Sequence, residues 1–380
     1  MPDYLEHHRI KITALAPIHI GDGTSIGKKE YIRRRSSKQV IIPDKLKMFR
    51  GLQDEKMDVA FERYMLDDTK NDLGQWLEEQ HVSDELIDEW TDYVLSAADA
   101  FRAVKSRGKV NTPKDINCFI KDAYGMPYVP GSSIKGMIRT ALAAYELNRN
   151  KGKYSTELRE LKRQVSDNRY GKSGTNRNRY MLRETANIET AVFNRLERNP
   201  KRQGDAVNSV MSGLIVSDSE VITTDRLTLS QKIDYTADGK VTPLPILRET
   251  IIPGTDIIFD MTIDKSLFGY SIDDIMSALE LMNKTAYKYF YNHFGRGSKS
   301  SDTVWLGGGA GFASKTFLYA VYQDEATEII DSVFWNTVRD YQKHHHNTDM
   351  QNGIAPHMCK CTLYQGNLYD MGMGKIEVIE

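Results

Sequence analysis

Residues 129–145 read Val-Pro-Gly-Ser-Ser-Ile-Lys-Gly-Met-Ile-Arg-Thr-Ala-Leu-Ala-Ala-Tyr. Their apolar residues recur at alternating spacings of three and four, which predicts an amphipathic helix with Ser132 or Ser133 as its N-cap. Lys135 and Arg139 are four residues apart and therefore fall on one face of this helix. Backbone N–H groups at a helix start, beside a cation, are typical of sites that hold phosphates.

A strand and a glycine-rich turn precede this segment. The apolar residues of 10–20 occupy every second position, which predicts a strand with one buried face. The turn Gly21–Lys29 follows and ends in Lys28 and Lys29, and residues 40–43 form a second short apolar run. We therefore expect a strand, a loop and a strand in this part of the chain.

A second glycine-rich loop lies near the other end of the chain. Residues 307–311 read Gly-Gly-Gly-Ala-Gly, and Lys315 follows. Because glycine costs backbone entropy, such a run indicates a need for close approach or for positive φ, or else a tight turn before the final strand.

These three segments share backbone N–H groups next to a cation, which favours binding of a phosphodiester backbone. Their spacing fits neither a P-loop nor a dinucleotide fingerprint. The predicted RNA-binding residues are Gly21, Lys28, Lys29, Ser132, Ser133, Lys135, Arg139, Gly307, Gly308, Gly309, Gly311 and Lys315.

The remaining periodicity indicates an α+β protein. Helices are predicted within residues 54–100, including one stripe that runs from Leu86 to Ala98, and over residues 271–294 and 324–342. Strands are predicted at residues 213–216, 220–224 and 255–263, followed by a short β-rich tail.

Charge is unevenly distributed along the chain. The net charge is −1, yet residues 51–100 hold 15 acidic and 3 basic residues, a balance of −12, and residues 151–203 hold 14 basic and 6 acidic residues, a balance of +8. The basic segment is a candidate nucleic-acid contact, and the alternative is that both segments are solvated surfaces. Apolar periodicity fades over residues 150–205, which predicts a long insertion, partly mobile in the free protein.

The composition is that of a soluble globular chain. Its 380 residues are 40% apolar and 27% charged, and its three cysteines are too few for a disulfide framework. No signal peptide or membrane-spanning run is present in the sequence, so we expect a cytoplasmic protein without a membrane partner.

The sequence offers little for catalysis or metal binding. His19, at the end of the first strand, is the one candidate acid or base for RNA cleavage, and a structural or RNA-contacting role is favoured over it. His357, Cys359 and Cys361 lack paired zinc-ligand spacing, and His344–His346 read as a solvated surface. We therefore expect no metal and no cofactor.

Several segments resemble the RAMP superfamily of CRISPR-associated proteins, and within it the family of fifth Csm subunits of type III-A effector complexes. The resemblance is carried by Leu15–Gly23, Lys28–Tyr31, Val129–Arg139 and Leu306–Phe312. It implies two ferredoxin-like (RRM-like) modules: residues 1–150 with an acidic helical insertion at about 51–100, a basic insertion at 151–205, and residues 206–380 with the glycine-rich loop.

The resemblance also implies a function. Such a subunit binds CRISPR RNA (crRNA) at its 3′ end, caps the filament of backbone and small Csm subunits, and supports 3′ maturation by host nucleases without a nuclease site of its own. One alternative is a metal-independent endoribonuclease of the same superfamily that processes precursor crRNA with His19. Another is a protein scaffold whose basic segment binds an acidic protein.

Overall fold

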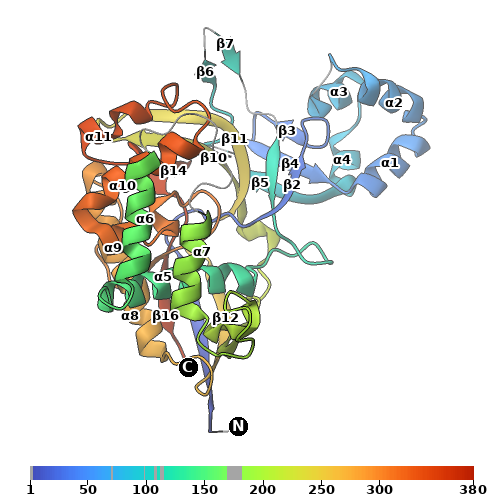
Figure 1. The fold of residues 1–380 in the computed structure, drawn as a ribbon. Helices are drawn as coiled ribbons and strands as arrows, with labels where there is room; N and C mark the ends of the chain where they lie inside the picture. Colours follow the sequence, from blue (N-terminus) through green and yellow to red (C-terminus); the bar gives the residue numbers. More distant parts are fainter. Residues whose placement is uncertain (1–2, 70–71, 98, 107–108, 112–114, 169–181) are drawn as a thin grey trace.

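The two ends of the chain meet in one antiparallel sheet (Figure 1). The computed structural model describes residues 3–69, 72–97, 99–106, 109–111, 115–168 and 182–380. The sheet has the order β13–β16–β1–β12–β9. Its strands are β1 (Leu5–Ala14), β9 (Leu214–Val216), β12 (Asp256–Asp264), β13 (Thr303–Trp305) and β16 (Met373–Val378).

Four of these strands form a ferredoxin-like arrangement with two helices, α5 (Gly131–Arg149) and α8 (Ile272–Tyr289). Along the chain the elements run β1, α5, β9, β12, α8 and β16, and in the sheet these strands have the order 4-1-3-2. The two helices pack against each other. This module therefore takes its strands from both halves of the chain, and the expected division at residues 150 and 206 cuts across it.

Strand β1 confirms the alternation in the sequence up to Ala14, with Ile10 and Ile12 fully buried. The predicted continuation to residue 20 is wrong, because the chain leaves the sheet after Ala14 and Ile18 makes only a single bridge to Ile251. Pro17 has no N–H to donate, which interrupts a ladder at this point.

Helix α5 begins at the predicted motif, but the expected serine N-cap is wrong. Pro130 occupies the N-cap position, and the N–H of Gly131 donates to Asp218 Oδ1 at 2.8 Å. A Cβ on Gly131 would lie 2.3 Å from the Val216 carbonyl oxygen, so glycine lets the helix start pack directly on β9.

A second, mixed sheet has the order β2–β8–β11–β10–β5–β4–β3, and β14 and β15 extend it beside β10. The predicted turn at Gly21–Lys29 is a strand as far as Ile26, which pairs with β8. The α+β class is confirmed, and the second ferredoxin-like module stays a prediction. The strands are β2 (Gly21–Ile26), β3 (Ile32–Arg34), β4 (Gln39–Pro43), β5 (Thr91–Ser96), β8 (Ile116–Phe119), β10 (Leu227–Thr236), β11 (Val241–Ile251), β14 (Met358–Tyr364) and β15 (Asn367–Asp370). A separate hairpin joins β6 (Val104–Ser106) and β7 (Lys109–Asn111).

The acidic region forms a lobe that stands apart from the body (Figure 1). Its four helices enclose their own core around Leu52, Tyr64 and Trp76. The predicted continuation of the last helix beyond Trp90 is wrong: the helix ends at Trp90, whose carbonyl accepts from the Asp44 N–H, and the next residues form β5. Ala98, the last residue of the predicted stripe, lies outside the described residues. The helices are α1 (Lys45–Asp54), α2 (Asp58–Leu66), α3 (Leu73–Glu79) and α4 (Asp84–Trp90).

Two helices lie within the basic segment, α6 (Ser155–Asn168) and α7 (Leu182–Phe193). The prediction that apolar periodicity fades here is wrong for both helices, since Leu158, Leu161 and Val165 are buried, as are Ile188 and Val192. Few apolar residues suffice here because their spacing places them on one face of each helix. The stretch at 170–180, Tyr-Gly-Lys-Ser-Gly-Thr-Asn-Arg-Asn-Arg-Tyr, lies outside the described residues.

Most later elements confirm the sequence reading. Helix α8 has a capping box between Ser271 and Asp274, and the β-rich tail is present. Residues 220–224 are not a strand, because their N–H groups donate to two different segments: that of Glu220 to the Ile258 carbonyl and that of Ile222 to the Pro127 carbonyl. The other helices are α9 (Leu318–Tyr322), α10 (Ala326–Thr337) and α11 (Asp349–Asn352). No helix in the described ranges is long and apolar enough to span a bilayer.

Glu249, fully buried in β11, joins neighbouring strands of the second sheet to the segment around His19. Its carboxylate accepts from Lys121 Nζ at 2.6 Å, the Tyr93 hydroxyl at 2.6 Å and the Phe119 N–H at 2.7 Å. Its backbone carbonyl accepts from His19 Nδ1 at 2.8 Å, and the His19 carbonyl accepts from the Gly308 N–H at 2.7 Å. These hydrogen bonds hold the segment around His19 against the glycine-rich loop.

Lys121→Met removes the only cation in contact with Glu249 among the described residues. We expect the free energy of unfolding to fall by about 3–5 kcal/mol, because a buried carboxylate then lacks its counter-charge. Urea unfolding at pH 7 measures the loss. Lys11→Met, which breaks the surface pair with Glu377, is the matched control and should change stability far less. Equal losses in the two variants would contradict this role of Lys121.

His19 makes stability depend on pH. Burial is the main cause that lowers the pKa of His19 to about 4, below its usual value of about 6.5. Between these values the unfolded chain binds the proton and the folded chain does not, so the free energy of unfolding falls as pH drops from about 6.5 to 4, by up to about 3 kcal/mol. His19→Asn keeps a donor near the Nδ1 position and should lose this dependence. Urea unfolding between pH 7 and 4.5 tests the prediction, and parallel pH profiles would refute it.

Candidate nucleic-acid interface

A cleft of about 450 Å³ lies where all three glycine-containing segments meet. Its wall is supplied by Ile20 and Gly21 after the first strand, by the exposed face of α5 and by the glycine-rich loop. No acidic side chain lines it among the described residues. The lining residues are Ile20, Gly21, Ser133, Gly136, Met137, Thr140, Trp305, Leu306, Gly307, Gly308, Ser314 and Lys315.

The glycine-rich loop packs against the segment around His19. Gly307 has φ +83°, and a Cβ there would lie 2.3 Å from the His19 carbonyl oxygen. Gly309 has φ +98°, and its Cβ would lie 2.4 Å from Arg248 Nη1. At these two positions glycine is required by the protein's own packing, which the sequence alone could not distinguish from a need to approach a ligand.

Arg248, Lys232 and Lys315 lie around this loop, and the first two were not predicted. Arg248 in β11 is half-buried, its Nη1 donates to the Gly308 carbonyl at 3.4 Å, and its Nε has no hydrogen-bond partner among the described residues. Burial lowers the pKa of Arg248. Lys232 in β10 has its pKa lowered to about 8 by burial, with a further contribution from the charges of Lys360 and Arg248.

Lys315 is the predicted cation of the group. The side chain is exposed overall, but partial enclosure of its ammonium group and the charge of Arg248 lower its pKa. Among the described residues no carboxylate forms an ion pair with Lys315 or Arg248. The loop is therefore a region of surplus positive charge, which attracts phosphates.

The predicted lysines of the first turn lie elsewhere. Lys29 Nζ donates to the carbonyls of Tyr64, Met65 and Asp67 at 3.2, 2.9 and 3.0 Å, so it caps the C-terminal end of α2. Lys28 is half-buried beside it and does not line the cleft.

The cations of α5 also turn away from the cleft. Lys135 Nζ donates to the Leu214 carbonyl at 2.6 Å, and burial lowers its pKa. Arg139 pairs with Glu189 at 3.0 Å and lies over the ring of Phe193 at 4.5 Å. The cleft is lined instead by Ser133, Gly136 and Thr140 of the same helix.

The remaining predicted residues occupy separate positions. Ser132 is exposed on the first turn of α5 and does not line the cleft. Gly311 has φ +90° and lies beside a second cavity, of about 320 Å³, which Lys232 and Lys360 also line.

Signals for the missed residues were present in the sequence. Arg248 and Glu249 are adjacent charges inside an otherwise apolar run, which indicates a buried and specific role. Gly136 interrupts a helix without a backbone requirement, since a Cβ there meets nothing within 4 Å. A glycine that costs helix stability and faces a cleft indicates that something approaches the helix closely.

Within the part of the chain that the structure describes, metal-ligating side chains form two buried groups, His346 with Asp349 and His357, and Cys359 with Cys361 and Asp370. The prediction that His344–His346 form a solvated surface is wrong for His346, which is buried against Asp349.

Comparisons with known proteins agree with the motifs. The family model of the RAMP superfamily matches residues 11–312. Proteins named CRISPR system Cms protein Csm5 are similar along the sequence. That of Mycobacterium tuberculosis is 26% identical over 397 residues, covering 100% of this chain and 99% of the relative. That of Streptococcus thermophilus is 28% identical over 318 residues, covering 81% and 79%.

Solved structures share the fold. A chain in the cryo-EM structure of a type III-A Csm–crRNA–target RNA ternary complex has a TM-score of 0.58 at 17% identity, covering 98% of this chain and 100% of that one. The crystal structure of T. onnurineus Csm5 has a TM-score of 0.60 at 18% identity, covering 96% and 99%. The resemblance found from the motifs is confirmed, and because the family match extends over most of its length, the chain belongs to the RAMP superfamily.

Proposed function

We propose that this chain is a non-catalytic, RNA-binding subunit of a type III-A CRISPR effector complex, in which it binds the crRNA, caps its 3′ end and supports 3′ maturation. The observation that carries the proposal is the cleft in which Gly21, Ser133 and the glycine-rich loop converge, with Lys315 at its wall and Arg248 behind the loop. The relatives' names and the Csm–crRNA complex among the structural neighbours support the same assignment.

The cleft fits a phosphodiester backbone better than a free nucleotide. It is open, it lacks acidic side chains among the described residues, and glycine or hydroxyl residues line much of it. Phosphates would balance the surplus positive charge of Lys315 and Arg248. Because Gly136 has no side chain, helix α5 leaves room for the sugar–phosphate backbone of the RNA. Binding would then depend on charge and shape more than on base sequence.

The partners follow from the same assignment. The chain would join backbone and small Csm subunits on the crRNA, and host nucleases would act on the RNA that extends beyond it. Ser132, Lys135, Arg139, Lys28, Lys29, Gly309 and Gly311 stay predicted RNA contacts, and the lysines and arginine among them would have to exchange internal partners for phosphate.

An endoribonuclease that uses His19 is less favoured. A side chain only 6% exposed, with a pKa of about 4, is a neutral imidazole near pH 7 and a poor proton donor to a leaving group. His19 is also absent from the residues that line the cleft. Discrete fragments from repeat-containing RNA in the presence of EDTA would establish the enzyme instead.

Gly136 offers a matched pair of substitutions. Gly136→Ala should raise the free energy of unfolding by up to about 1 kcal/mol, because alanine favours a helix and the added Cβ meets nothing within 4 Å. Gly136→Asp should fold but bind single-stranded RNA at least about tenfold more weakly, because its carboxylate enters the cleft and repels phosphates. Fluorescence anisotropy and thermal unfolding measure the two effects.

The same pair tests the 3′-end assignment. Complexes assembled in cells with Gly136→Asp should contain less of this subunit and crRNA with altered 3′ ends, whereas Gly136→Ala should leave both near normal. Normal RNA affinity and normal 3′ ends with Gly136→Asp would place the RNA outside this cleft.

The salt dependence of RNA binding distinguishes two possible paths. Lys315→Gln should reduce the slope of log affinity against log salt by about 0.7, the value for one phosphate contact with a single strand. A Lys135→Ala, Arg139→Ala double variant should change the slope less, because these side chains would first have to give up their bonds to Leu214 and Glu189. A slope that changes only in the double variant would move the RNA path to the opposite face of α5.

A further inference from the structure

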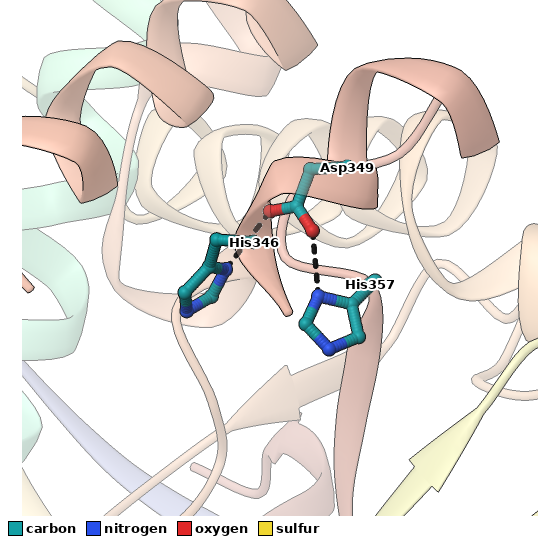
Figure 2. Close-up of side chains that lie close together, drawn as sticks. All are labelled: His346, Asp349 and His357. Carbon is teal, nitrogen blue, oxygen red and sulfur yellow. Dashed lines mark hydrogen bonds and ion pairs between the residues drawn. The ribbon is translucent and has the colours of Figure 1, made fainter. Parts of the chain in front are cut away.

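A fully buried carboxylate lies between two histidines in the segment before β14 (Figure 2). His346 Nδ1 is 3.0 Å from Asp349 Oδ2, and His357 Nδ1 is 2.6 Å from Asp349 Oδ1. The ring centroids are 5.2 Å apart, and one ligand atom from each of the three residues lies within 4.8 Å of the others. We infer that His346, Asp349 and His357 form a binding site for a zinc-class transition-metal ion.

The charge of the group supports a cation. Asp349 is 0% exposed, and among the described residues neither Lys nor Arg pairs with it, so its charge is met only by the two imidazoles. Burying an ionised carboxylate is costly unless it is paired or coordinates a metal. A divalent ion would balance this charge within the cluster.

The donor set selects the kind of metal. Two imidazole nitrogens and one carboxylate oxygen are the three protein ligands of many zinc sites, whereas Mg²⁺ and Ca²⁺ require a shell of oxygen atoms. In a tetrahedral site with bonds of about 2.0 Å, neighbouring ligand atoms lie about 3.3 Å apart. The contacts of His346 and His357 to Asp349 therefore need to open by about 0.3 and about 0.7 Å, with each ring carrying its proton on Nε2.

The second buried group provides a contrast. Asp370 is already paired with Arg296 and accepts from the Gly297 N–H at 2.9 Å. The Cys359 and Cys361 sulfurs are 3.8 Å apart, and the neighbouring thiol and burial raise the pKa of Cys361. Because a cation and a backbone donor already satisfy this carboxylate, the charge argument applies to Asp349 and not to Asp370.

The position of the site gives it a consequence. His346 and Asp349 come from the turn before α11 and from its first residue, and His357 directly precedes β14, so a bound ion would tie α11 to the start of β14. His346 also lines the cavity of about 320 Å³ that Phe312 and Gly311 of the glycine-rich loop border. The inference does not depend on the proposed RNA function.

Metal content and titration test the site directly. The full chain, purified without a polyhistidine tag and stripped with a chelator, should take up one Zn²⁺ per chain in competition with a chromophoric chelator, and its melting temperature should rise with Zn²⁺ but not with Mg²⁺. Asp349→Asn and His357→Gln should lose this uptake. His344→Gln, which changes an exposed neighbouring histidine, should retain it.

Cobalt identifies the ligands. Co²⁺ in this site should give visible d–d bands without the near-ultraviolet charge-transfer band of a thiolate–cobalt bond. A thiolate band would assign binding to Cys359 and Cys361 and overturn the proposal. Zn²⁺ uptake far below one per chain in the wild type, or full uptake by correctly folded Asp349→Asn, would overturn it as well.

Discussion

The carboxylate of Glu249 is the constraint on which the arrangement of the candidate interface depends. It is fully buried, so each of its acceptor sites must be satisfied from within, and Lys121, Tyr93 and the Phe119 N–H do this from β8, β5 and the residues beside them. The backbone of the same residue holds the ring of His19, and the backbone of His19 holds the glycine-rich loop. A single position in β11 thus aligns segments that are far apart in the sequence.

This arrangement explains the different roles of the glycines. Gly307 and Gly309 allow the loop to lie against His19 and Arg248. At Gly136 an added Cβ would meet nothing within 4 Å, so this glycine leaves the cleft open. Arg248 contacts the loop from behind without a carboxylate partner among the described residues. Packing and charge are therefore combined at one loop, where a half-buried cation would find its counter-charge in the polyanion proposed to bind the cleft.

The sequence predicted the local elements better than their assembly. Periodicity located β12, α5 and α8, because each buries one face with a regular spacing. Periodicity failed at residues 91–95, because helix α4, which ends at Trp90, and strand β5, which begins at Thr91, share a continuous apolar pattern. Only the pairing with β4 shows that these residues form a strand. The cations of α5 were assigned to RNA from their spacing, and spacing carries no information about Glu189 or the Leu214 carbonyl, which are brought close by the fold. Arg248 was missed for the same reason.

The pairing of β1 with β12 determines how early the first sheet can form during synthesis. Ile10 pairs with Phe259, and the two are 249 residues apart in the chain (259 minus 10). At about 5–20 residues per second, the first strand leaves the ribosome roughly 12 to 50 s before its central partner is made. During this interval its buried edge and apolar face have no native partner, so the nascent chain depends on chaperones or on temporary contacts to avoid aggregation.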